Sequence, residues 1–293
     1  MNGRQTSRRG ADGQIGAPPP ARTLAAARPP WLGALPALGV VGLLFGGVLV
    51  GAVRTSLQAN PLAGGSSLDA WQAVLGDARF GAAVAFTVAV TAVTTAVSVI
   101  IALPVAAALR GRGWSRTVAT VPVLVPHLLV AAVAVLWLGP GGLVDRLVAG
   151  LPFDVVRARS GLGIIIVYLV KEVPFLALLL LSAWDDAVAA REEAAAIHSA
   201  GPVATIWHVV LPAVRGPLLM GSIVIAAFVL GSFEVPLVMG PTSPDTVATY
   251  ALAVTQVAAL SGRAEAAAAL LVVTAVAFLL AIAAGVLLWR RRA

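Results

Sequence analysis

Three ionisable side chains lie inside strongly apolar segments of this sequence. Lys171 and Glu172 interrupt "VYLVKEVPFLALLLL", and Glu234 interrupts "GSFEVPLVMG". An ionised side chain at the centre of a bilayer costs at least about 2.5 kcal/mol, so each one needs a polar partner or a water-filled cavity. Adjacent residues on a helix point about 100° apart, and we therefore expect Lys171 to pair with Glu234 rather than with Glu172. Such charges could hold a helical bundle together, contact a solute or relay a coupling ion.

The sequence offers little for metal binding or covalent catalysis. Of its histidines, His127 lies in an apolar segment, while His198 and His208 are ten residues apart, which is not the spacing of a local metal site. The chain has no cysteine, and HExxH and GxSxG patterns are absent. Lys171 follows "VYLV" instead of a glycine-rich loop that could hold ATP phosphates. We expect no metal, no cofactor and no catalytic residue in this chain.

The composition indicates a chain that crosses a membrane several times. Of its 293 residues, 59% are apolar and 11% are charged, whereas soluble domains contain about 25% charged residues. Apolar runs of roughly 20 residues cross a bilayer, and we predict such helices at 31–53, 80–109, 117–138, 162–183, 213–239 and 266–289. Residues 31–293 should form an all-α, polytopic membrane bundle of six transmembrane helices. Residues 1–30, rich in Pro, Gly and Arg, should be a disordered basic tail.

Prolines lie inside or beside several predicted spans. They are Pro104, Pro122, Pro126, Pro174 and Pro236. Each removes a backbone donor and favours a kink, although prolines are more common in membrane helices than in soluble ones. The sequence alone does not decide whether these prolines kink their helices or are ordinary residues of membrane spans.

The net charge of +7 fits a membrane topology better than a nucleic-acid surface. Arginines gather in the N-terminal tail, in "RGRGWSR" and in the closing "WRRRA", and no basic face interleaved with aromatic residues is present. The positive-inside rule then places both termini and residues 184–212 in the cytoplasm. We expect a lipid bilayer, and no nucleic acid, as a partner.

Residues 184–212 form a polar interruption and predict a helix, a turn and a second helix at the cytoplasmic surface. In "EEAAAIHSAGPVATIWHVVLP", Glu192 and Glu193 lie on the first helix. Residues 199–201 should break that helix, and Pro202 suits the first turn of the next one. The second helix carries an apolar surface that needs a partner, formed by Ile206, Trp207, Val209, Val210 and Leu211. This arrangement is typical of a docking element.

The spacing in this loop resembles the EAA loop of permease subunits of binding-protein-dependent ABC importers. The pattern is Glu193-Ala194-Ala195, three residues, Ser199, nine residues, then Val209-x-Leu211-Pro212. The likeness covers roughly residues 80–290 and includes "LPVAAALRGRGWSRTVATVPVLVPHLLVAAV". Two features depart from the family: Ser199 replaces its usual glycine, with Gly201 two residues later, and "DDAVAA" replaces an Ile-Pro pair. The candidate coupling residues are Glu192, Glu193, Ala194, Ala195, Ser199, Gly201, Val209, Leu211 and Pro212.

The resemblance implies a transport subunit that is not itself an enzyme. In that family the loop is a coupling helix seated on a separate cytoplasmic ATPase, which binds ATP and Mg. Glu193 would pair with a basic residue there, Ala194 and Ala195 would permit close approach, and the turn at 199–201 would fix the angle. The first helix would wrap a partner subunit.

Other implied partners are a second permease, identical or paralogous, and an extracytoplasmic solute-binding protein. The implied location is the bacterial cytoplasmic membrane. "GSFEVPLVMGP" is reminiscent of permeases for polyamines, iron, thiamine or oxyanions more than of those for sugars.

Two other classes of function account for parts of the sequence. An ion-coupled secondary transporter would use Lys171, Glu172 and Glu234 as a relay, but it leaves the loop unexplained. A membrane enzyme or an assembly scaffold would need clustered catalytic groups or a large soluble appendage, and the sequence shows neither.

Overall fold

The computed structural model describes residues 33–58, 65–148, 155–184, 186–198, 201–257 and 261–290. Over these ranges the chain is helical, with one isolated β-bridge between Gln58 and Ser66. The predicted all-α class is therefore confirmed. The predicted tail at 1–30 and Ser199 of the predicted turn lie outside the described residues.

The chain divides into two units, residues 1–47 and residues 48–293. Helix α1 (Leu35–Ser56) begins in the first unit and ends in the second. The other helices belong to the second unit, and their bounds are α2 Asp69–Gly76, α3 Ala78–Leu109, α4 Ser115–Leu124, α5 His127–Leu138, α6 Leu143–Leu147, α7 Leu162–Ala183, α8 Asp186–Ile197, α9 Pro202–Thr205, η2 Ile206–Val210 (a π-helical turn), α10 Leu211–Gly231, α11 Glu234–Met239, α12 Val247–Val257 and α13 Ser261–Arg290.

Six helical segments of the described residues are long and apolar enough to cross a membrane, which confirms the predicted membrane bundle. They are Leu35–Ser56, Ala78–Leu109, His127–Leu147, Leu162–Ala183, Pro202–Gly231 and Ser261–Ala283. The third lies later in the sequence than the predicted 117–138, and the fifth begins before the predicted 213–239. The third differs because the predicted span is broken at Val125, and the fifth begins earlier because the second helix of the loop continues into α10.

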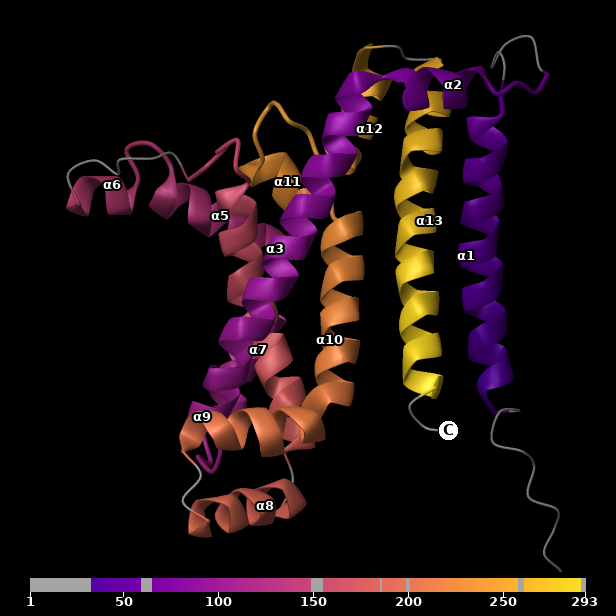
Figure 1. Ribbon diagram of the computed structural model, residues 1–293. Helices are drawn as coiled ribbons and strands as arrows, with labels where there is room; N and C mark the ends of the chain where they lie inside the picture. Colours follow the sequence, from indigo (N-terminus) through magenta and orange to yellow (C-terminus); the bar gives the residue numbers. More distant parts are fainter. Residues whose placement is uncertain are drawn as a thin grey trace, which may run out of the picture. The chain divides into compact units, whose positions relative to one another are not determined.

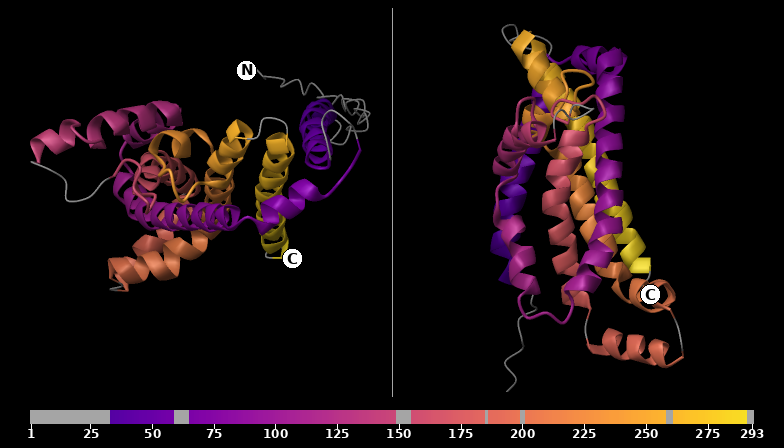
Figure 2. Two further views of the ribbon diagram at one scale, coloured as in Figure 1. Left: turned by 90° about the horizontal axis from the view of Figure 1, so that it is seen from above. Right: turned by 90° about the vertical axis from the view of Figure 1, so that its left-hand side faces the viewer.

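Helix α7 lies at the centre of the second unit. It packs against α3, α4, α5 and α10, and Figures 1 and 2 show α3, α7 and α10 side by side. Tyr168, Leu176 and Leu180 of α7 are fully buried in the main apolar cluster. Gly221 of α10 permits close packing here, since a Cβ at this position would lie 2.5 Å from Leu176 Cδ1 and 2.8 Å from Leu179 Cδ2. Small residues at membrane helix interfaces commonly allow such approach.

A second apolar cluster joins α2, α3, α12 and α13 at the end of the unit opposite α8 (Figure 1). Polar contacts surround it. Tyr250 donates to Asp77 Oδ2 at 2.8 Å, and the Val247 N–H donates to Thr87 Oγ1 at 3.0 Å. Burial raises the pKa of the Tyr250 hydroxyl above its ordinary value, and the Asp77 carboxylate raises it further. The hydroxyl therefore remains a donor, which fixes α12 against the start of α3.

Two predicted spans are each split by a proline. Within the predicted span 117–138, α4 ends at Leu124 and α5 begins at His127. Val125 between them is extended, because a residue that precedes a proline disfavours the helical region. The span 213–239 breaks at Ser232, which is also extended. Pro236 cannot donate to the Ser232 carbonyl four residues earlier, and its ring would clash with that carbonyl in a continuous helix. Helices α3 and α7 continue through their own prolines, Pro104 and Pro174.

Replacing Gly221 with valine should destabilise the bundle, because the new side chain would overlap Leu176 and Leu179. Overpacking of this kind costs about 1–3 kcal/mol, and in a chain of this size each kcal/mol lowers the unfolding midpoint by roughly 2–4 °C. Thermal unfolding of the purified protein in detergent measures the effect. Gly216→Val in the same helix is the control, since a Cβ there meets no atom within 4 Å. Equal midpoints for the two variants would contradict the assigned contact.

Candidate functional site

Lys171 caps the end of α4 at the first helix break. Its Nζ donates to the carbonyls of Pro122 at 2.9 Å and Val123 at 2.7 Å, and also to the carbonyl of Val125. The last carbonyls of a helix have no intrahelical partner, and that end of the helix dipole favours a cation. An ammonium group has three protons, so these three carbonyls use all of them. The side chain is only 5% exposed.

Glu172 interacts with the other side of the same break, at the start of α5. Its Oε1 lies 3.2 Å from Nε2 of His127, the first residue of α5. This places a carboxylate near the positive end of the α5 dipole, where a negative charge is stabilised. Two adjacent residues of α7 thus bring opposite charges to two helix ends of opposite polarity. The angle of about 100° between neighbouring side chains allows this division.

The expected ion pair between Lys171 and Glu234 is wrong. Lys171 is bonded to backbone carbonyls, and the exposed Glu234 has no ion-pair partner among the described residues. The expectation assumed one continuous helix over 213–239, whereas Glu234 is the first residue of α11. The break at Ser232 ends α10, so Glu234 does not continue the helical face on which α10 meets α7.

A cavity of about 490 Å³ lies between the two helix breaks. The first break contributes Pro126 and His127, the second contributes residues 232–235, and α10 contributes Phe228. A smaller cavity of about 170 Å³ shares His127 and Phe228, whose ring centroids are 4.6 Å apart, and reaches Lys171 and Glu172. Tyr168 and Ser232 hydrogen-bond through their hydroxyls and attach the second break to α7.

Broken helices have a particular meaning in a membrane protein. Non-helical backbone at membrane depth is tolerated where it is buried in protein or lines a water-filled cavity. Transporters use discontinuous helices for this purpose, and their solute sites lie at such breaks. The cavity, with the open carboxylate of Glu234 and the rings of Phe228 and Phe233, is therefore the candidate solute passage.

The predicted helix, turn and second helix are present at one end of the second unit. Helix α8 packs against α9 and η2, and the run from α9 through η2 crosses the end of the bundle before α10 turns along it (Figure 1). Gly201 precedes Pro202, which occupies the first turn of α9. Val209 lies in η2, and Leu211 and Pro212 begin α10. The second helix therefore does not stop at Pro212 but continues into the fifth span.

Glu192 fixes α8 to the bundle. Its carboxylate accepts a hydrogen bond from Trp184 Nε1 at 3.1 Å and forms an ion pair with Arg110, whose guanidinium lies 4.9 Å from the centre of the Trp184 ring. Arg110 follows α3 and Trp184 follows α7, so one carboxylate ties α8 to two spans. Arg110 is far from Glu192 in the sequence, and neither Arg110 nor Trp184 was predicted as a partner of Glu192.

Glu193 and Ala194 face away from this anchor and are exposed, while Ala195 is partly buried. Large apolar side chains of the same end are also exposed: Ile197 at 81%, Val203 at 67% and Trp207 at 63%. Clustered exposed apolar side chains mark a surface for another protein or a membrane. The loop therefore presents one acidic and several apolar groups on a support held by Glu192.

No family model matches the sequence. The chain is 30% identical over 191 residues to the inner membrane ABC transporter permease protein YnjC of Escherichia coli (strain K12). That alignment covers 62% of this chain and 36% of YnjC, so the chain matches about a third of that relative's length.

The fold is similar to chains in two solved structures. One is a bacterial ABC transporter involved in the import of the acidic polysaccharide alginate, with a TM-score of 0.68 and 16% identity, covering 87% of this chain and 94% of that chain. The other is the bacterial alginate ABC transporter in complex with an alginate pentasaccharide-bound periplasmic protein, with a TM-score of 0.70, 17% identity, and coverage of 87% and 91%. At these identities the likeness establishes a shared fold.

Lys171→Met should destabilise the bundle, because three buried carbonyls at the end of α4 lose their donor. Each unsatisfied buried group costs about 1–3 kcal/mol, so the free energy of unfolding should fall by at least about 2 kcal/mol. Thermal unfolding in detergent and the yield of purified protein report the loss. Val170→Met, at the neighbouring 47% exposed position, should behave as wild type. A stable Lys171→Met protein would show that the ammonium does not hold the break.

Proposed function

We propose that the chain is a permease subunit of an ATP-driven ABC importer. It lines part of a solute passage and couples, through its loop, to ATPase subunits that are separate chains. The loop carries this proposal: Glu192 holds α8 against the bundle while Glu193, Ala194 and Trp207 face outward. An element that is anchored on one face and exposed on the other suits the transmission of a rigid-body movement.

Similarity supports the same function. The 191-residue likeness to an inner membrane ABC transporter permease and the shared fold of the two alginate transporter chains point to this class. The spacing from Glu193 to Pro212 resembles that of the coupling loop in this class. In the proposal, the loop faces the cytoplasm, both termini lie there, and the protein resides in the bacterial cytoplasmic membrane.

The intramembrane charges favour this function over ion-coupled transport. A relay residue must gain and lose a proton or an ion during each cycle. Lys171 instead donates all three protons to carbonyls, and Glu172 is held by His127 at the start of α5. Both are structural groups in this arrangement. Of Lys171, Glu172 and Glu234, only Glu234 lines the cavity between the helix breaks, and a single carboxylate forms no relay.

In the proposed importer, the partner subunits carry out the energy conversion. The ATPase subunits hold ATP and Mg, so this chain performs no catalytic step. A second permease, identical or paralogous, completes the passage, and an extracytoplasmic binding protein delivers the solute. On its resemblance, "GSFEVPLVMGP" favours a polyamine, iron, thiamine or an oxyanion over a sugar.

Co-purification from native membranes tests the proposal. The tagged wild-type chain should retain an ATPase with a nucleotide-binding loop, and Glu193→Lys should lose most of it, because the substitution reverses the outward charge without touching the anchor at Glu192. Mass spectrometry after mild crosslinking quantifies the retained ATPase.

Asp69→Lys is the matched control, since it reverses an exposed acidic charge in α2, at the opposite end of the second unit from α8. It should retain the ATPase at the wild-type level. A folded wild-type chain that retains no ATPase would overturn the importer function, and uptake abolished by proton uncouplers at constant ATP would favour a secondary transporter.

A further inference from the structure

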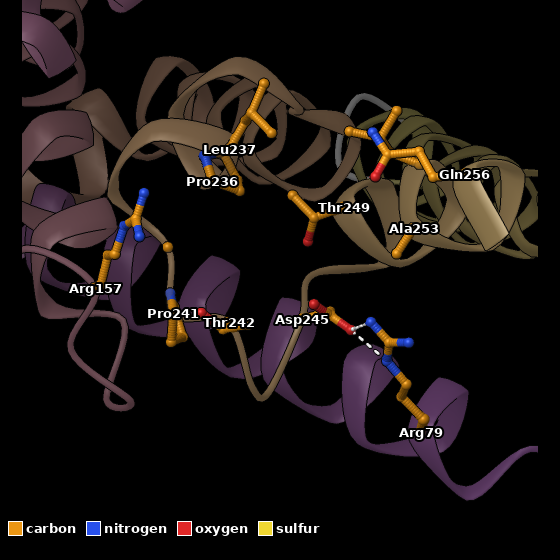
Figure 3. A pocket seen from close by; sticks show the side chains of 12 residues that line it. Arg79, Arg157, Pro236, Leu237, Pro241, Thr242, Asp245, Thr249, Ala253 and Gln256 are labelled. Atoms are coloured by element: carbon orange, nitrogen blue, oxygen red, sulfur yellow. Dashed lines mark hydrogen bonds and ion pairs between the residues drawn. The ribbon is translucent and has the colours of Figure 1, made fainter.

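A pocket of about 290 Å³ opens at the end of the second unit opposite α8. We call it the Arg157 pocket; Figure 3 shows its lining. Arg157 stands at one side, and Arg79, at the start of α3, stands at the other with Asp245. The pocket shares none of its lining residues with the cavity between the helix breaks. It is therefore separate from the candidate solute passage.

Arg157 has an unusual backbone for an arginine. Its φ is +60°, in the left-handed region that costs a residue with a Cβ roughly 1–2 kcal/mol. Its N–H donates to the Met239 carbonyl at 2.9 Å, which attaches the segment before α7 to the end of α11. Glycine would make the same backbone hydrogen bond without the steric cost. An arginine therefore occupies a backbone conformation that glycine would adopt at a lower steric cost.

The Arg157 guanidinium is not used inside the described part of the chain. It forms no hydrogen bond or ion pair with any described residue. By contrast, Arg79 binds Asp245 Oδ2 through Nε at 2.7 Å and through a terminal nitrogen at 2.6 Å. The described lining thus holds two guanidinium groups and one carboxylate, and the unbalanced charge is positive.

The rest of the lining suits the insertion of a side chain. Thr242 of the loop after α11 and Thr249 and Gln256 of α12 provide hydroxyl and amide groups, and Pro236 and Leu252 provide apolar walls. Since a water occupies about 30 Å³ of liquid, the pocket holds the equivalent of roughly ten waters. That volume fits a carboxylate side chain with its hydration better than a whole oligomeric solute.

We propose that the Arg157 pocket receives the carboxylate of an Asp or Glu side chain from a soluble extracytoplasmic protein that docks on this end of the chain. The inference rests on the proposed function, which places the end opposite α8 outside the cytoplasm. Arginine binds carboxylate through two parallel charge-assisted hydrogen bonds, which fix orientation as well as contact. A fold relative crystallised together with a periplasmic protein supports the class of partner.

Site-specific photocrosslinking in cells tests the docking site. A benzoylphenylalanine placed at the exposed Thr242 should crosslink to a soluble solute-binding protein, at a peptide within a few residues of an Asp or Glu. Arg157→Glu should reduce that crosslink at least about tenfold, because a charge-assisted hydrogen bond is replaced by repulsion. Replacing that acidic residue of the solute-binding protein with arginine, in combination with Arg157→Glu, should restore the crosslink.

Two further variants separate binding from folding. Arg159→Glu makes the same charge change two residues away, outside the pocket lining, and should leave the crosslink intact. Arg157→Gly should lose the crosslink while unfolding at the wild-type temperature or above, since the backbone cost is removed.

An unchanged crosslink in Arg157→Glu, or a Thr242 probe that labels only lipid, would overturn the docking site. The ATPase should co-purify with every variant. If it fails to do so with the wild-type chain, the proposed function has failed; if it is retained while the crosslink is insensitive to Arg157, only the docking site has failed.

Discussion

A lysine ammonium that satisfies three backbone carbonyls makes the interior of this bundle possible. Pro126 ends α4 inside an apolar region, where the freed carbonyls need a hydrogen-bond donor. Lys171 reaches them from α7, and Glu172 stabilises the restart of the chain at His127. Because the two charges belong to adjacent residues of the most buried helix, the break is fixed to the core. The hydrogen bonds from Lys171 hold the break in place beside the opening between the helices.

The second break completes the cavity by a different route. Pro236 lacks the N–H that would donate to the Ser232 carbonyl in a continuous helix. The Ser232 hydroxyl hydrogen-bonds to the hydroxyl of Tyr168 in α7. Both breaks are therefore attached to the same helix, one through Lys171 and Glu172 and the other through Tyr168. A movement of α7 would therefore act on both breaks at once. In the proposed importer, this gives the ATPase-driven movement of the loop a way to alter the passage.

The two glutamates of the loop have separate tasks that follow from helix geometry. Glu192 points to Arg110 and Trp184 and joins α8 to the ends of α3 and α7. Glu193, about 100° further round the helix, is exposed. The anchor and the docking surface thus occupy different faces of one short helix, which connects the position of a bound partner to the two helices at the centre of the bundle.

The sequence by itself determined the elements of this protein. Runs of apolar residues predicted six spans, and the Glu193 to Pro212 spacing, with Pro202 after Gly201, predicted the helical pair, because length, periodicity and cap residues are local properties. Local rules also identified Pro126 and Pro236 as places where a helix could break. They could not decide that both spans do break while Pro104 and Pro174 are tolerated, since that depends on what satisfies the freed carbonyls.

Only the tertiary structure decided the partners of the charged residues. The prediction joined Lys171 to Glu234 because Lys171 and Glu172, adjacent on one helix, are poor partners for each other. The break at Ser232 moved Glu234 into the cavity, and the break at Val125 supplied carbonyls that take all the protons of Lys171. Likewise, Arg110, counted in the sequence only as a sign of topology, became the partner of Glu192. Pairing energy depends on distance and burial in three dimensions, and neither quantity is encoded in the separation of two residues along the chain.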